Sequence, residues 1–117
     1  YFTYIYVKQG TTTWLHRREG ADIWQGLYEP LLLETAAEPS APALKKTDFW
    51  RNLFGRKSPR LLAGPVKHVL SHRVIYAWFY EVSVAPGAPV PAGFLRVPVE
   101  ELKNYAFPRL VQKVLLK

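Results

Sequence analysis

The residue types that could do chemistry gather in residues 67–73, which are Lys-His-Val-Leu-Ser-His-Arg in this 117-residue chain. Ser71 and His72 could suggest a nucleophile and its base, but adjacent side chains rarely point at each other, and no carboxylate lies nearby in sequence to orient the base. His68 and His72 have the four-residue spacing of a helical metal site. In a β-strand four residues span about 13 Å, which is too far for one ion. We therefore predict no catalytic residue and no metal site.

The charge of the chain indicates a polyanionic partner. The formal net charge is +7, and no Asp or Glu occurs between Phe49 and Tyr80. The basic run there borders the polar segment, which favours contact with a phosphate backbone. A solvated, soluble surface is the alternative explanation of the same charge. The chain has no cysteine, which excludes disulfides, thiolate catalysis and Cys-based zinc or iron-sulfur sites within it.

The element that must position this segment is the apolar run at residues 74–82. Apolar residues occupy both alternating faces of this run, with Tyr76 and Trp78 on one face and Ala77 and Phe79 on the other. This pattern is typical of a central strand covered on both sides. The polar segment then lies where a packed strand meets solvent, so its side chains can meet a ligand with little loss of freedom.

Alternating apolar residues, caps and turn residues predict the remaining elements. The expected strands are residues 2–8 and 11–18, joined as a β-hairpin, and then residues 31–34 and 94–97. The expected helices are a short one between Thr47 as N-cap and Gly55 as stop, followed by residues 98–105 and 108–116. Irregular segments are expected at residues 36–42, 56–65 and 85–93. Strands outweigh helices in a mixed order, which predicts an α+β domain with a mixed sheet.

Length and composition favour one folded domain that covers residues 1–117. The chain starts at Tyr1 and contains no Met, so we interpret it as a domain cut from a longer polypeptide. No apolar run approaches the roughly 20 residues of a membrane helix, and no signal-peptide pattern opens the chain. We therefore expect no membrane partner, and the absence of cysteine fits an intracellular location.

Five short motifs are spread over nearly the whole chain: WLHRR at 14–18, GLYEP at 26–30, HVLSH at 68–72, VPVEEL at 97–102 and YAFPRL at 105–110. Their order and spacing resemble the C-terminal domain of MutY-type adenine DNA glycosylases. The resemblance implies a Nudix-like fold, in which a mixed β-sheet is packed between helices. It also implies a bacterial, cytoplasmic enzyme of base excision repair.

Recognition of a damaged base is the activity that this resemblance implies. In the family, a Phe-Ser-His loop reads the 8-oxoguanine opposite the adenine to be removed, and the matching residues here are Leu70, Ser71 and His72. Ser71 would read the base through its hydroxyl and backbone, and His72 would make a neighbouring polar contact. Leu70 would be an apolar buttress or wedge. Because Leu replaces the Phe that is common in the family, it offers no aromatic face for stacking.

The resemblance also implies the partners of the domain. The ligand would be double-stranded DNA with an 8-oxoguanine:adenine mispair, and Lys67, Arg73, Arg17 and Arg18 would be its phosphate contacts. The family carries its catalytic acids and a 4Fe-4S cluster in the N-terminal catalytic domain of the same chain, which would be the second partner. This segment would then hold no cofactor and would not be an enzyme by itself.

Less specific explanations exist for the same residues. Ser71 could cap a turn, His72 could donate to a loop carbonyl, and each basic residue could simply be solvated. A Nudix-type hydrolase of oxidised nucleotides needs paired glutamates on a helix to bind magnesium, but residues 46–55 hold one carboxylate, Asp48. A protein-binding domain that uses the aromatic surface and the Pro-rich residues 86–91 is the other alternative.

Overall fold

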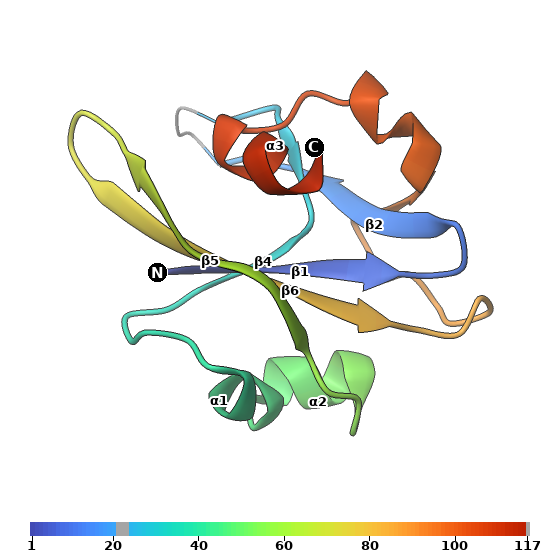
Figure 1. The fold of residues 1–117 in the computed structure, drawn as a ribbon. Coiled ribbons are helices and arrows are strands. Elements are labelled where there is room, and N and C mark those ends of the chain that lie inside the picture. Colours follow the sequence, from blue (N-terminus) through green and yellow to red (C-terminus); the bar gives the residue numbers. More distant parts are fainter. Residues whose placement is uncertain (21–23, 117) are drawn as a thin grey trace.

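The computed structural model describes residues 1–20 and 24–116, which form two β-sheets flanked by short helices (Figure 1). The strands are β1 (Phe2–Lys8), β2 (Thr12–Arg17), β3 (Tyr28–Glu29), β4 (Leu31–Glu34), β5 (Arg60–Val69), β6 (Val74–Ser83) and β7 (Leu95–Pro98). The helices are α1 (Ala41–Lys45), α2 (Asp48–Phe54), the 3₁₀ helix η1 (Val99–Asn104) and α3 (Arg109–Leu115). Among the described residues, no helix is long and apolar enough to cross a membrane.

The larger sheet is mixed and has the strand order β4-β1-β6-β5. Strand β1 runs parallel to β6 and antiparallel to β4, and β5 and β6 form an antiparallel hairpin at one edge. The second sheet, β3-β2-β7, is antiparallel. This architecture confirms the α+β domain with a mixed sheet that the sequence predicts.

The predicted hairpin between residues 2–8 and 11–18 is wrong. Within the described part of the chain, one isolated bridge joins Gln9, which follows β1, to Thr12, around a turn in which Gly10 has a φ of 62°. Both edges of β1 are already occupied, because β4 pairs with one and β6 with the other. Strand β2 therefore leaves the first sheet and pairs with β3 and β7 in the second.

Alternation along β6 divides the core into two layers. Ile75 and Phe79 belong to the apolar cluster that includes η1 and α3, whereas Trp78 and Tyr80 pack with α1 and α2. Figure 1 accordingly shows α1 and α2 on one side of the larger sheet and α3 on the other. Burial on both faces confirms the predicted central strand, although Tyr76 near the hairpin end is 40% exposed.

Capping residues set the ends of the helices. Thr47 caps α2 and Gly55 ends it with a φ of 60°, as predicted. Helices η1 and α3 lie in the two predicted C-terminal segments and are shorter by one residue at each end. Helix α1 was not predicted, because it begins at Ala41 inside the expected irregular segment 36–42, with Ser40 as its N-cap.

Strand β5 runs through much of residues 56–65, which the sequence analysis expected to be irregular. The strand begins at Arg60, and its pairing with β6 is interrupted around Gly64. Gly64 has a φ of 139°, and a Cβ atom there would lie 2.8 Å from Cδ1 of Trp78. The Gly-Pro pair that indicates a loop in the sequence is therefore an irregularity within a long strand.

Candidate nucleic-acid interface

Residues 70–73 form the tip of the β5-β6 hairpin, which extends beyond the body of the sheet (Figure 1). The backbone N–H of Leu70 donates to the carbonyl of Arg73 at 2.8 Å, which closes a turn with Ser71 and His72 at its central positions. Both of these side chains are exposed. The packed strand β6 thus holds a tip whose polar groups face solvent.

The polar groups of the tip are not used inside the domain. Among the described residues, neither the Ser71 hydroxyl nor the His72 imidazole has a hydrogen-bond partner, and the same holds for their two backbone N–H groups. Within residues 1–20 and 24–116, Ser71 is therefore not a side-chain cap of the turn, and His72 does not donate to a loop carbonyl. These donors and acceptors remain available to a ligand.

A pocket of about 350 Å³ opens beside this tip. Turn residues 70–73 form one wall, the adjacent strand β6 supplies Ile75, and distant segments supply Phe2, Arg18, Trp24 and Glu34. Phe2, Trp24 and Ile75 are buried and form an aromatic and aliphatic lining, to which Arg18 and Arg73 add positive charge and Glu34 a carboxylate. A flat aromatic ring with polar edges, such as a nucleobase, suits this combination.

Two turn residues fasten the tip to the core. Leu70 is half-buried and packs against the apolar cluster that contains Phe2, which favours the role of a buttress over that of a wedge. The guanidinium carbon of Arg73 lies 5.5 Å from the centre of the Phe2 ring, within the range of a cation–π contact. The exposed pair between them is thus held from both sides.

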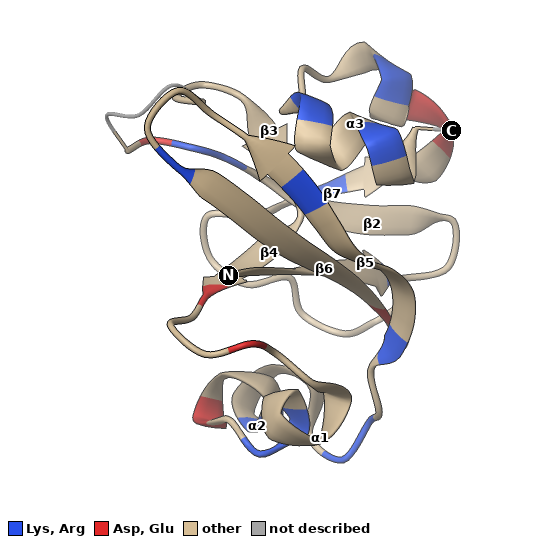
Figure 2. Ribbon diagram, turned by 60° about the vertical axis from the view of Figure 1, so that its left-hand side comes forward, with Lys and Arg blue, Asp and Glu red and all other residues tan. Residues whose placement is uncertain are grey.

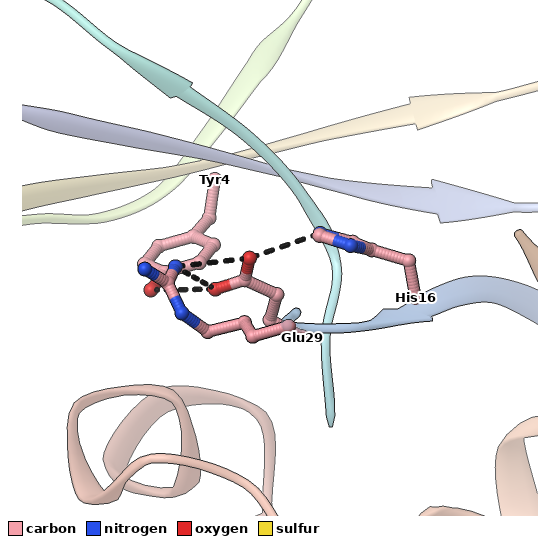
Figure 3. Close-up of polar contacts among 4 residues, drawn as sticks. Tyr4, His16 and Glu29 are labelled. Atoms are coloured by element: carbon pink, nitrogen blue, oxygen red, sulfur yellow. Dashed lines mark hydrogen bonds and ion pairs between the residues drawn. The ribbon is translucent and has the colours of Figure 1, made fainter. Parts of the chain in front are cut away.

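Arg18 lines the pocket and also belongs to a buried polar cluster. Figure 3 shows Tyr4, His16 and Glu29 of this cluster. Glu29 is 1% exposed, and its carboxylate accepts from Arg18 Nη1 at 2.9 Å and 3.1 Å. Nε2 of His16 lies 2.9 Å from the same carboxylate, and the hydroxyl of Tyr4 donates to it at 3.4 Å. Burial and the nearby Glu29 raise the pKa of Tyr4, so this phenol stays a neutral donor.

The four predicted phosphate contacts do not lie together. Arg18 and Arg73 line the pocket. Arg17 is exposed and, by the alternation of the strand, lies on the face of β2 opposite to the polar cluster. Lys67 pairs across the hairpin with Tyr76, so it lies on the hairpin face that points away from the pocket.

Several residues of this region were not identified as site residues from the sequence. They are Phe2, Trp24, Glu34 and Ile75 in the pocket and Glu29 at the centre of the polar cluster. Phe2, Trp24 and Glu34 come from β1, the segment before β3 and β4, which are brought to the turn by the fold, whereas Ile75 belongs to β6, directly after the turn. Glu29 does carry a signal, because a single carboxylate within an apolar run must be paired if the run is buried.

The described residues hold no group of three His, Asp or Glu side chains that could bind a metal ion. Helix α2, the candidate for a magnesium-binding Nudix helix, carries Asp48 as its one carboxylate.

Comparison with known proteins defines the family. The NUDIX domain profile matches residues 2–117, which is nearly the whole chain. The chain belongs to the NUDIX domain family. A comparison with curated protein sequences finds no match for this NUDIX domain.

Solved structures share the fold of this NUDIX domain. The C-terminal domain of mouse MUTYH, solved in complex with human PCNA, matches with a TM-score of 0.70 and 20% identity over 97% of this chain and 83% of that one. The MutT protein of Methanosarcina mazei Go1 matches with a TM-score of 0.66 and 12% identity, over 98% and 88% of the two chains. The Nudix hydrolase RenU of M. smegmatis matches with a TM-score of 0.63 and 10% identity, over 97% and 79%. These similarities confirm the Nudix-like architecture.

Proposed function

We propose that this NUDIX domain reads 8-oxoguanine opposite adenine in duplex DNA, as the lesion-recognition part of an adenine DNA glycosylase. The observation that carries the proposal is the exposed pair Ser71 and His72, whose polar groups have no partner among the described residues. The five motifs that resemble MutY-type enzymes and the fold shared with the C-terminal domain of mouse MUTYH support it. The basic charge of the chain fits the same ligand.

The chemistry of the oxidised base matches the groups at the tip. Oxidation at C8 turns N7 of guanine from an acceptor into an N–H donor and adds a carbonyl oxygen. The Ser71 hydroxyl can accept from that N7–H, while a backbone N–H of the turn donates to the new oxygen. With ordinary guanine the hydroxyl can rotate and donate to N7, but the backbone N–H has no oxygen at C8 to bind, and an unmade buried hydrogen bond costs about 1–3 kcal/mol.

The domain discriminates 8-oxoguanine from guanine, while another part of the enzyme hydrolyses the glycosidic bond of adenine. In this proposal, an N-terminal catalytic domain with a 4Fe-4S cluster extrudes the mispaired adenine and hydrolyses its glycosidic bond. The domain with Ser71 lowers the energy of the complex that contains the oxidised base, which helps to commit the correct adenine to extrusion.

The test is an NMR titration of the 117-residue chain at low salt, with two duplexes that differ only in 8-oxoguanine or guanine opposite adenine. We expect the amide signals of Leu70, Ser71 and His72 to shift with the oxidised duplex alone. Ser71→Ala should remove this difference, and the matched variant Ser83→Ala, at an exposed position at the end of β6, should keep it. Identical shifts with both duplexes, confined to basic residues, would overturn the proposal.

Binding of a protein is the second candidate function. The C-terminal domain of mouse MUTYH was solved in complex with human PCNA, and this chain exposes an apolar strip on the hairpin face that points away from the pocket. The strip consists of Tyr1, Val69, Val74 and Tyr76, which are 43%, 66%, 45% and 40% exposed. In this second candidate, Val69→Ser with Val74→Ser should abolish binding to PCNA and leave DNA binding unchanged.

Hydrolysis of oxidised nucleotides is the alternative raised by the shared fold of the Nudix hydrolase RenU. The single carboxylate of α2 argues against it, because magnesium on a pyrophosphate needs several oxygen ligands. Magnesium-dependent release of pyrophosphate from an oxidised guanine nucleotide would support this alternative.

A further inference from the structure

The β5-β6 hairpin has two faces with different basic residues. His68 pairs with Ile75 and therefore lies on the hairpin face that carries the pocket, whereas Lys67 pairs with Tyr76 and lies on the other face. The His68 ring centre is 5.9 Å from that of Trp24, a pocket residue. Lys67 therefore does not belong to the pocket face, and any other basic residue on this face must come from an element that packs beside His68.

Helix α3 supplies these groups. It is anchored by the buried residues Leu110 and Val111, and it packs against β5. Arg109 and Lys113 are four residues apart, so they share one face of the helix, and both are exposed. They line a shallow hollow of about 440 Å³ together with Gln112.

The positive charge of this region is not neutralised by carboxylates of the elements that form it. Neither α3 nor β5 contains Asp or Glu, as Figure 2 also shows. Among the described residues, Arg109, Lys113 and Arg73 form no ion pair, whereas Arg60 pairs with Glu81 at 3.1 Å. Uncompensated cations at this spacing repel each other, and a bound anion relieves that repulsion.

Electrostatic coupling links α3 to the hairpin. Burial lowers the pKa of His68, and the positive charges of Lys113 and Arg109 lower it further. His68 therefore lies within the positive electrostatic potential of Lys113 and Arg109. Since His68 contacts Trp24, this potential extends from α3 to the edge of the pocket.

We propose that Arg109 and Lys113, with His68 beside them, bind phosphates of the DNA backbone on the pocket side of the hairpin. The proposal rests on the proposed function in taking duplex DNA as the ligand. The backbone then runs from Arg73 at the tip, past Trp24 and His68, to α3. The phosphate contacts of α3 would hold the duplex independently of its sequence, in addition to the base contact made by Ser71. Lys67 contacts no phosphate along this path.

The test compares binding of the oxidised and the undamaged duplex by the 117-residue chain over a range of salt concentrations. In the double variant Arg109→Gln, Lys113→Gln, affinity should fall by the same factor for both duplexes. The slope of log affinity against log salt should decrease by about 2, which corresponds to two lost phosphate contacts. Ser71→Ala should instead weaken binding of the oxidised duplex alone.

The control variant Arg51→Gln, Arg56→Gln removes the same charge from exposed positions at α2, on the opposite side of the sheet. A double variant of α3 that binds no more weakly than this control would overturn the α3 site and leave the lesion reading by Ser71 intact. If the wild-type chain prefers neither duplex while the α3 variant still loses affinity, the lesion reading fails and the α3 site stands. Absence of binding by the wild-type chain at low salt would overturn both.

Discussion

Arg18 and Glu29 form the ion pair on which the wall of the pocket depends. Nη1 of Arg18 lies 2.9 Å and 3.1 Å from the two carboxylate oxygens of Glu29, and the guanidinium lies 5.6 Å from the centre of the Trp24 ring. Because Glu29 belongs to β3 and Arg18 follows β2, the pair ties the second sheet together at the point where it meets the pocket. Glu29 is thus a positioning residue for Arg18 and Trp24.

Glu29→Ala should destabilise the domain strongly. The change removes the Glu29 carboxylate that Arg18 and His16 contact, in a region where their side chains are 13% and 27% exposed. Removing one partner of a buried ion pair costs about 3–5 kcal/mol, and the residual exposure puts this site near the lower value. Urea unfolding followed by tryptophan fluorescence measures the change. Glu38→Ala, at an exposed position, should alter stability by less than about 0.5 kcal/mol, and equal effects of the two variants would contradict the prediction.

Stability should fall as the pH rises above 10. Burial raises the pKa values of Tyr4, Tyr6 and Tyr80, with a further increase for Tyr4 and Tyr6 from nearby carboxylates. Tyrosines of the unfolded chain lose their protons near pH 10, whereas the folded chain retains them, so alkaline pH favours the unfolded state. Urea midpoints measured between about pH 8 and 11 should decline less steeply for Tyr4→Phe than for the wild type. Tyr76→Phe, at an exposed position, is the control, and parallel curves for all three proteins would refute the assignment to Tyr4.

Gly64→Ala should disrupt the hairpin that carries the tip. The new Cβ would approach Trp78 at 2.8 Å, and a φ of 139° is strained for any residue with a side chain. We expect a loss of about 2–4 kcal/mol, since overpacking and backbone strain each cost about 1–3 kcal/mol. Thermal or urea unfolding gives the value. Gly87→Ala, where no atom lies within 4 Å, should be nearly neutral, and a similarly small effect at Gly64 would show that the backbone relaxes there.

The sequence predicted best where local chemistry decides the structure. Helix α2 follows from a threonine cap and a glycine stop, and the central strand follows from apolar residues on both of its faces. The polar tip at Ser71 and His72 was located for the same reason, because it directly precedes that strand. The strand β5 was partly missed, since Gly64 and Pro65 have the local pattern of a loop while pairing with β6 holds them in an extended segment.

The surroundings of the tip could not be predicted, because they depend on pairing between distant segments. Phe2 and Glu34 reach the pocket only because β1 lies between β6 and β4. Strand β2 joins a second sheet because both edges of β1 are occupied, and this pairing brings Arg18 to Glu29. The local periodicity of the sequence does not indicate it. Lys67 was chosen as a phosphate contact for its nearness in sequence, yet strand alternation turns it away from the pocket.

The variant Leu70→Ala should show whether Leu70 supports the tip from within the domain or contacts the DNA itself. The half-buried side chain packs on the cluster that contains Phe2 and lines the pocket, so its removal should lower the free energy of unfolding by about 1–2 kcal/mol. Because the turn loses its support, the preference for 8-oxoguanine should also fall, while affinity for the undamaged duplex should stay the same. Leu70→Met, which conserves volume, should restore both properties. Urea unfolding and duplex titrations provide the two measurements, and loss of affinity for undamaged DNA at unchanged stability would show that Leu70 touches the duplex itself.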